Sequence, residues 1–334
     1  LDMMDRRMAY ALVSLVLLVG YLRRIYMQGD IGATVLDMMD MGYTKQFGFQ
    51  KRFANSTGPL AKVYFLDNLY NVKSDLPPLV LIHGFNMRAP QMATYFYPLF
   101  THRNRRVIII GLLGHENNYL PKFRIPTLNE MVSSCIDTID YALTHHSTFD
   151  VIGVSLGGAL TSYMFHKIPH RIRKAILIAP TSFELIDMDF TKYAFECLKT
   201  RRMGFHTIQT MRHYYKTVLG MHDNAMPPSF ILRGIQKRCN NGIPKNYWTD
   251  FFKAVFVEAR IGDENFRHIL FSNPSAFKGY DVEIVLIVGE RDKLTSFAKC
   301  RQFKEFTGNR VSMYVVKDSG HLGPQRVVTR LLIH

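Results

Sequence analysis

The sequence predicts an α/β protein with a mainly parallel central sheet that is covered by helices. Short apolar runs recur between segments of helical character, as is typical of strands that are buried on both faces. These runs are residues 79–82, 107–110, 149–153, 174–179, 282–288 and 311–316. About a hundred residues separate the fourth run from the fifth, far more than one crossover helix needs. We therefore expect an inserted helical cap, and an uncharged stretch near the N-terminus predicts an additional hydrophobic helix.

The uncharged stretch, residues 8–22, has the character of a membrane anchor. An arginine pair flanks it on each side (Arg6 and Arg7, Arg23 and Arg24). As a helix it would span about 22 Å, and snorkelling arginines extend that reach toward a hydrocarbon core of about 30 Å. A signal peptide and a buried helix are the alternatives, but no small-residue cleavage site follows directly. We expect residues 1–30 to anchor the protein, with its body on the cytosolic side because basic residues follow the anchor.

The chain is basic, with 42 lysine and arginine residues against 27 aspartate and glutamate residues. Its basic residues form small scattered clusters, without the interleaved aromatic residues or the recognisable module of a nucleic-acid-binding protein. We expect solvated surface charge, with attraction to an anionic membrane as the alternative and no nucleic-acid partner. The four cysteines are far apart and form no C-x-x-C pair, which indicates neither a disulfide framework nor a zinc site.

Two further strands are expected before the buried runs. Alternating residues within 45–53 and 61–66 predict two half-buried strands that are joined by a turn at residues 55–59. A helix is expected over residues 128–144.

Residues 149–163, F-D-V-I-G-V-S-L-G-G-A-L-T-S-Y, predict a short buried strand, an abrupt turn and a helix that begins near Leu156. The turn spells G-V-S-L-G and places Ser155 at its apex. A serine on so tight a turn adopts strained backbone angles, and its neighbours two residues away must be nearly free of side chain. Gly153 and Gly157 meet that condition, which is the pattern of a nucleophilic serine.

A nucleophilic serine needs a histidine as base and an acid that orients the histidine. Loops after two later strands supply both in the expected order, with Asp292 in G-E-R-D-K-L and His321 in K-D-S-G-H-L. Glu290 and Glu184 are rival acids, because each also follows a predicted strand. We expect Ser155, Asp292 and His321 to form a catalytic triad.

Two backbone N–H groups, those of Phe85 and Leu156, are expected to form an oxyanion hole. Leu156 begins the helix after the serine, and Phe85 lies in an H-G-F turn after a buried strand. His83 in that turn is expected to orient the loop through hydrogen bonds. His115 and Glu116 could form an acid–base pair, although a part in loop architecture is the preferred interpretation. No metal or cofactor is expected.

The segment of residues 182–271 predicts the cap, because methionine, phenylalanine and tyrosine recur in it at mixed helical spacing. Its aromatic residues are more typical of a cap core than of a ligand-binding wall. The chain then divides into an anchor segment (1–30), the first part of the core (31–181), the cap (182–271) and the second part of the core (272–334).

Five motifs together resemble the α/β-hydrolase family: H-G-F (83–85), G-H-E (114–116), G-V-S-L-G-G (153–158), G-E-R-D (289–292) and S-G-H (319–321). Within this family the chain is most similar to the membrane-anchored monoacylglycerol lipases, which have a single N-terminal hydrophobic helix. The cap segment 227–252 also resembles theirs, and the likeness covers residues 45–330. Where the family has an aspartate and a proline before G-H, this chain has Gly111 and Leu113.

The resemblance implies a membrane-associated serine hydrolase that cleaves carboxyl esters of lipids, with monoacylglycerol as the expected substrate. The triad alone does not distinguish this activity from that of a phospholipase, another esterase or a C–C bond hydrolase. An epoxide hydrolase would need an aspartate in place of Ser155. The alternative of another class is a catalytically silent membrane-bound scaffold. Such a protein would be expected to have lost a triad residue or an elbow glycine, and this chain keeps them all.

Overall fold

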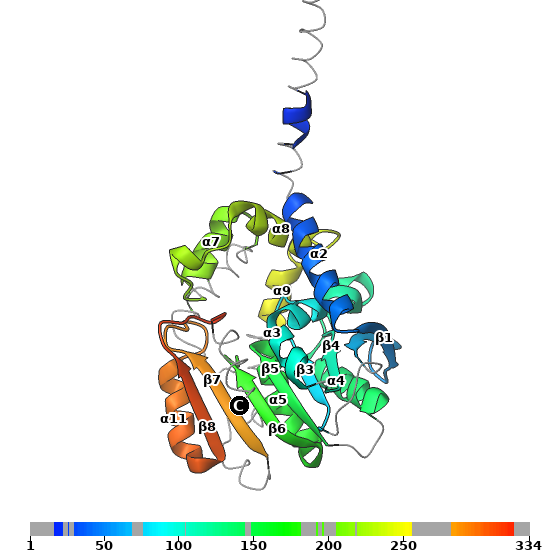
Figure 1. Ribbon diagram of the computed structural model, residues 1–334, viewed down its shortest axis with the longest axis vertical. Coiled ribbons are helices and arrows are strands. Elements are labelled where there is room, and N and C mark those ends of the chain that lie inside the picture. Colours follow the sequence, from blue (N-terminus) through cyan, green and yellow to red (C-terminus); the bar gives the residue numbers. More distant parts are fainter. Residues whose placement is uncertain are drawn as a thin grey trace, which may run out of the picture.

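The computed structural model describes residues 17–22, 26, 30–68, 76–103, 105–143, 148–181, 192, 196, 205–217, 219–255 and 282–323. In these ranges eight strands form one central sheet in the order β1-β2-β4-β3-β5-β6-β7-β8 (Figure 1). They are β1 (Gln50–Asn55), β2 (Lys62–Asp67), β3 (Leu79–Ile82), β4 (Val107–Ile110), β5 (Phe149–Val154), β6 (Ile172–Ile178), β7 (Glu283–Gly289) and β8 (Val311–Val316). The pairs β1–β2 and β2–β4 are antiparallel and the other five are parallel, which confirms the predicted mainly parallel sheet.

Helices cover both faces of the sheet. Helix α3 packs on the face that carries Leu79 and Leu81 of β3, whereas α4, α5 and α11 pack on the face that carries Val80 and Ile82. Successive side chains of a strand point to opposite faces, so a strand covered on both sides must be apolar throughout. These helices are α3 (Ala89–Arg103), α4 (Leu128–Leu143), α5 (Leu156–Lys167) and α11 (Phe297–Thr307). Short 3-10 helices lie at Glu116–Asn118, Pro121–Phe123, Pro169–Arg171, Asp223–Ala225 and Gly308–Arg310.

Two expectations for the start of the sheet were wrong. The strand expected from residue 45 begins at Gln50, because helix α2 (Asp30–Gln46) occupies residues 45 and 46. Strand β2 is buried at five of its six residues and is not half-buried. The reason is that β1 and β4 pair along its two sides while α3 and α4 contact it.

Three described α-helices lie within the predicted cap: α7 (Ile208–Thr217), α8 (Ser229–Asn240) and α9 (Tyr247–Lys253). Figure 1 shows them beyond the ends of the strands, with α2 beside α8. Helices α2 and α8 cross where Gly32 meets Gly234. A Cβ atom on Gly32 would collide with the carbonyl oxygen of Phe230, and one on Gly234 would collide with the backbone of Gly32. Backbone contact between two glycines therefore joins α2 to α8, a helix of the predicted cap segment.

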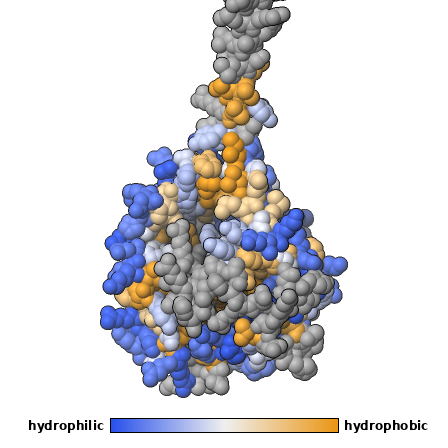
Figure 2. All heavy atoms as spheres, in the orientation of Figure 1, coloured by the Kyte–Doolittle hydropathy of each residue, from blue (hydrophilic) through white to orange (hydrophobic). Residues whose placement is uncertain are grey.

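Most of the predicted membrane anchor lies outside the described residues. Residues 17–22 are helical, and the side chains of Leu17, Leu18 and Leu22 are exposed. Figure 2 shows apolar surface over this short helix and over the adjoining part of the body. Within the described ranges, no helix is both long enough and apolar enough to span a membrane.

The glycine crossing predicts opposite effects for two substitutions in the same helix. Gly32→Ala should lower the free energy of unfolding by about 1–3 kcal/mol, because the new methyl group collides with the backbone of α8. Gly42→Ala is the matched control, since a Cβ atom there meets nothing within 4 Å. It should raise the free energy of unfolding by about 0.5–1 kcal/mol through helix propensity. Urea denaturation measures both, and equal effects at the two positions would contradict the crossing.

Candidate active site

Ser155 lies at the turn between β5 and α5, where its backbone has φ 52° and ψ −115°. A residue with a side chain rarely adopts a positive φ, so this turn is strained. The serine N–H donates to the carbonyl oxygen of Ile178 in the neighbouring strand (2.9 Å). A Cβ atom on Gly153 would lie 2.5 Å from the carbonyl oxygen of Gly157, and one on Gly157 would collide with that of Ile82. Both elbow glycines are therefore required by steric contact.

Asp292 and His321 lie in the loops that follow β7 and β8. The His321 Nδ1 atom is 2.8 Å from Oδ2 of Asp292, and its Nε2 atom is 2.9 Å from Oγ of Ser155. The other carboxylate oxygen accepts the N–H groups of Leu294 and Thr295, each at 2.8 Å. Because the carboxylate acts as an acceptor, Nδ1 carries the ring proton and Nε2 accepts from the serine hydroxyl. The structure thus brings together the three side chains that the sequence predicts as a triad, and all three are buried.

Of the two rival acids, Glu290 does not occupy the position of Asp292. Glu290 is exposed, and its carboxylate accepts the N–H of Asp318 at 3.0 Å. Glu184 lies outside the described residues. Among the residues that the structure describes, Asp292 is the carboxylate that contacts His321.

Phe85 and Leu156, the two expected oxyanion donors, both adjoin the serine. Leu156 begins α5, and the first N–H groups of a helix have no acceptor within that helix. Phe85 follows Gly84, where a Cβ atom would lie 3.2 Å from the Cβ atom of Ser155. The positive end of the α5 dipole also points toward this position, which favours a developing negative charge.

His83 orients the turn that contains Phe85. The N–H of Leu112 donates to Nε2 of His83 (3.1 Å), and the protonated Nδ1 donates to the carbonyl oxygen of Gly84 (2.9 Å). Burial lowers the pKa of His83 to about 4, so the ring is neutral near pH 7 and Nε2 can accept. Both hydrogen bonds are to backbone atoms, which agrees with the expected structural part for this histidine.

His115 holds the next residue of the same turn. Its Nε2 atom accepts the N–H of Asn86 (3.1 Å), whose φ is 56°. Burial lowers the pKa of His115 well below its usual value, so this ring is also neutral. Glu116 accepts the N–H of Ala89 at the start of α3 (3.1 Å) and forms no hydrogen bond with His115. The two side chains support the loop and do not form an acid–base pair.

The departure from the family pattern at Gly111 has a local cause. A Cβ atom there would lie 2.8 Å from the carbonyl oxygen of Tyr64 and 2.9 Å from Nδ2 of Asn118. The Asn118 side chain donates to the Gly111 carbonyl (2.7 Å) and accepts the N–H of Tyr64 (2.8 Å). This buried amide fixes the loop that carries His115.

A contact between the predicted cap segment and the loop that carries His321 was not predicted from the sequence. The N–H of His321 donates to the carbonyl oxygen of Leu219 (2.7 Å), just after α7. Gly220 follows with φ 61°, and a Cβ atom there would collide with the backbone of Arg291. The available signal was a single glycine within the predicted cap segment, which does not identify what it approaches.

A mainly apolar cavity of about 130 Å³ opens onto Ser155 and His321. Phe205, Tyr214 and Tyr215 of the predicted cap segment line it. These side chains are also buried in the core, so the expected distinction between cap core and ligand-binding wall does not hold for them.

Several solved structures share this architecture. A carboxylesterase from Bacillus subtilis is 17% identical with a TM-score of 0.63, over 90% of this chain and 97% of that chain. A putative lipase from Acinetobacter baumannii AYE is 15% identical with a TM-score of 0.67, over 89% and 92%. A membrane phospholipase A, described as a bacterial virulence factor, is 16% identical with a TM-score of 0.67, over 97% and 94%. At these identities the likeness establishes the fold alone.

Sequence comparison gives the family. A segment of 123 residues is 30% identical to an uncharacterized carboxylesterase of Bacillus subtilis (strain 168), and it covers 36% of this chain. It spans 39% of that protein, well under two thirds of its length. The alpha/beta hydrolase fold family matches residues 77–324, a range that includes Ser155, Asp292 and His321. By this match and by its sheet and helices, the chain belongs to the alpha/beta hydrolase fold family.

Proposed function

We propose that this protein is a serine hydrolase that cleaves carboxyl esters of lipids, with monoacylglycerols as the substrate class. The observation that carries the proposal is the buried hydrogen-bonded chain from Asp292 through His321 to Ser155, at the N-terminus of α5. A serine hydroxyl that is hydrogen-bonded to an imidazole nitrogen is an activated nucleophile when a carboxylate orients the imidazole ring.

In the first half of the reaction, Oγ of Ser155 attacks the ester carbonyl while Nε2 of His321 takes the hydroxyl proton. The carboxylate of Asp292 stabilises the imidazolium that forms. The N–H groups of Phe85 and Leu156 bind the tetrahedral oxyanion. The C–O bond to the alcohol then breaks, and His321 donates its proton to the leaving glycerol oxygen, which leaves an acyl-serine.

In the second half, a water molecule donates a proton to Nε2 of His321 and attacks the acyl-serine carbonyl. The same N–H groups bind the second oxyanion. Its collapse breaks the bond to Oγ, returns the proton to Ser155 and releases the fatty acid.

The lining of the cavity at Ser155 supports an ester with a lipid acyl group as the substrate. The apolar cavity at Ser155 is lined by aromatic and aliphatic side chains that match an acyl chain. Proteins of similar fold include a carboxylesterase, a putative lipase and a membrane phospholipase A. The likeness of residues 227–252 to the monoacylglycerol lipases narrows the proposal to monoacylglycerols.

We also propose that residues 1–30 anchor the protein at a membrane, with residues 31–181 and 272–334 as a cytosolic core and residues 182–271 as its cap. Residues 8–22 carry no charge. The exposed side chains of Ile31, Met38 and Met41 follow helical spacing along α2, which gives that helix an apolar outer face. This face and the basic net charge of the chain suit an anionic lipid surface.

Substitution of the orienting acid tests the triad. Asp292→Asn should lower kcat by about 10⁴-fold, because the amide no longer selects the required tautomer of His321. Glu290→Gln, two residues away, is the matched control and should keep near-normal activity. Hydrolysis of a monoacylglycerol measures both, with circular dichroism to verify folding. If the two effects were reversed, the acid would be Glu290.

Removal of residues 1–24 tests the anchor. This truncation leaves α2 intact, so we expect the protein to move from the membrane pellet to the soluble fraction while still hydrolysing a water-soluble ester. A truncated protein that stays entirely in the pellet would show that another surface holds it at the membrane.

A further inference from the structure

A second cavity, of about 330 Å³, lies beside the apolar cavity at Ser155. The two cavities share four wall residues: Asn86, Met87, Gln91 and Ile235. The remaining walls come from α2, α8, α9, the turn before α3, the segment that follows β4 and the loop between α8 and α9. The mechanism proposed above uses none of the charged groups in this cavity, and its size is within the range of ligand sites.

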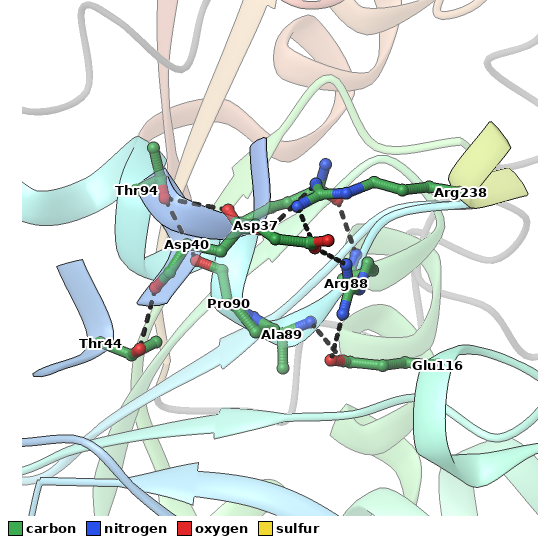
Figure 3. A network of polar contacts seen from close by, with 10 residues as sticks. Asp37, Asp40, Thr44, Arg88, Ala89, Pro90, Thr94, Glu116 and Arg238 are labelled. Atoms are coloured by element: carbon green, nitrogen blue, oxygen red, sulfur yellow. Dashed lines mark hydrogen bonds and ion pairs between the residues drawn. The ribbon is translucent and has the colours of Figure 1, made fainter. Parts of the chain in front are cut away.

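Charged side chains from α2, α8 and two loops build one wall of this polar cavity (Figure 3). The guanidinium group of Arg88 lies between the carboxylates of Asp37 (3.1 Å) and Glu116 (3.5 Å). Arg238 contacts Asp37 at 2.5 Å and Asp40 at 3.1 Å. The side chains of Glu116 and Arg238 are only 6% and 10% exposed. The wall is therefore held in place by its own ion pairs and does not need a ligand to order it.

The charges of the wall identify the kind of ligand that fits. Arg88 and Arg238 line the cavity together with Asp37 and Glu116, so the formal charges of these lining groups cancel. Asp40, which pairs with Arg238 outside the lining, adds one negative charge to the network. A phosphate group would therefore gain no net attraction from these paired charges to offset the water that it loses on entering the cavity. A neutral polyol offers hydroxyl groups that both donate and accept, which matches a wall that presents donors and acceptors side by side.

The location of the shared wall connects this cavity to the reacting bond. Asn86 and Met87 directly follow Phe85, the proposed oxyanion donor. An ester whose carbonyl oxygen is bound by the N–H of Phe85 has two parts, an acyl arm and an alcohol arm, one for each cavity. The acyl arm is apolar and suits the cavity at Ser155, so the alcohol arm is left for the polar one.

We propose that the polar cavity binds the uncharged polyol head group of the lipid ester. This inference rests on the proposed function and adds a selectivity to it: esters of glycerol or of a sugar are preferred over lysophospholipids with charged head groups. The groups responsible are the paired side chains of Asp37, Arg88, Glu116 and Arg238.

The test compares four esters of one fatty acid: a monoacylglycerol, a sucrose monoester, a lysophosphatidylglycerol and a methyl ester. For the wild type, kcat/KM should be higher for the two polyol esters than for the lysophospholipid. Ile243→Trp should fill the polar cavity that Ile243 lines. It should lower the ratio of monoacylglycerol to methyl-ester hydrolysis about fivefold or more, the equivalent of one or two lost hydrogen bonds.

Two further variants separate a head-group effect from a general structural effect. Ile168→Trp is the matched control, because Ile168 is also half-buried but lies at the C-terminal end of α5, away from Ser155. Its ratio of monoacylglycerol to methyl-ester hydrolysis should equal that of the wild type. Asn241→Arg adds a positive charge at an exposed position of the polar cavity and should shift the preference toward the lysophosphatidylglycerol.

The outcomes are distinguishable. Unchanged ratios in both Ile243→Trp and Asn241→Arg, with methyl-ester hydrolysis retained, would overturn the head-group site and leave the esterase proposal intact. A wild type that prefers the lysophospholipid would also overturn it. A folded wild type that hydrolyses none of the four esters would contradict the proposed function itself, and the head-group site with it.

Discussion

The hydrogen-bonded chain from Asp292 to His321 to Ser155 is the constraint on which the rest of this structure depends. Its three members follow β5, β7 and β8, and parallel strands bring their carboxyl ends to one edge of the sheet. The serine reaches this chain only because its backbone has a positive φ. That conformation requires the close backbone contacts at Gly153 and Gly157, so the local strain is held by packing against β3 and α5.

Residues outside the sheet hold in place the segments around this hydrogen-bonded chain. The carbonyl oxygen of Leu219, just after α7, fixes the backbone of His321, and His83 and His115 fix the turn that carries Phe85. Arg88 lies at the end of that turn and forms ion pairs with Asp37 of α2. A continuous set of contacts therefore runs from the N-terminal helix, through the ion pairs, to the turn beside the serine.

The strands and the candidate triad could be predicted because their signals are local. Buried strands are short apolar runs, and the bounds at 79–82, 107–110 and 311–316 match the structure. Asp292 and His321 follow such runs, so the edge of the sheet on which they meet follows from the topology. The burial of β2 was predicted wrongly from its sequence pattern. It depends on strands that pair with β2 and helices that pack on it from elsewhere in the chain.

Helix α2 and its ion pairs could not be predicted for a related reason. Its described buried residues are Gly32 and Asp40, whereas its apolar residues Ile31, Met38 and Met41 are exposed, so hydrophobic periodicity would assign the wrong face to the interior. It is held instead by a glycine contact with α8 and by ion pairs to Arg238, a residue 201 positions away from Asp37. Contacts of that kind depend on tertiary structure and leave no mark in local sequence.

The most direct measurement of the central claim is covalent labelling by a fluorophosphonate, followed by mass spectrometry of the modified peptide. Such a probe reacts with a serine that a histidine activates and an oxyanion hole supports. The account predicts a single adduct on Ser155 in the wild type and no labelling of Ser155→Ala. An adduct on a different serine, or equal labelling of the two proteins, would contradict it.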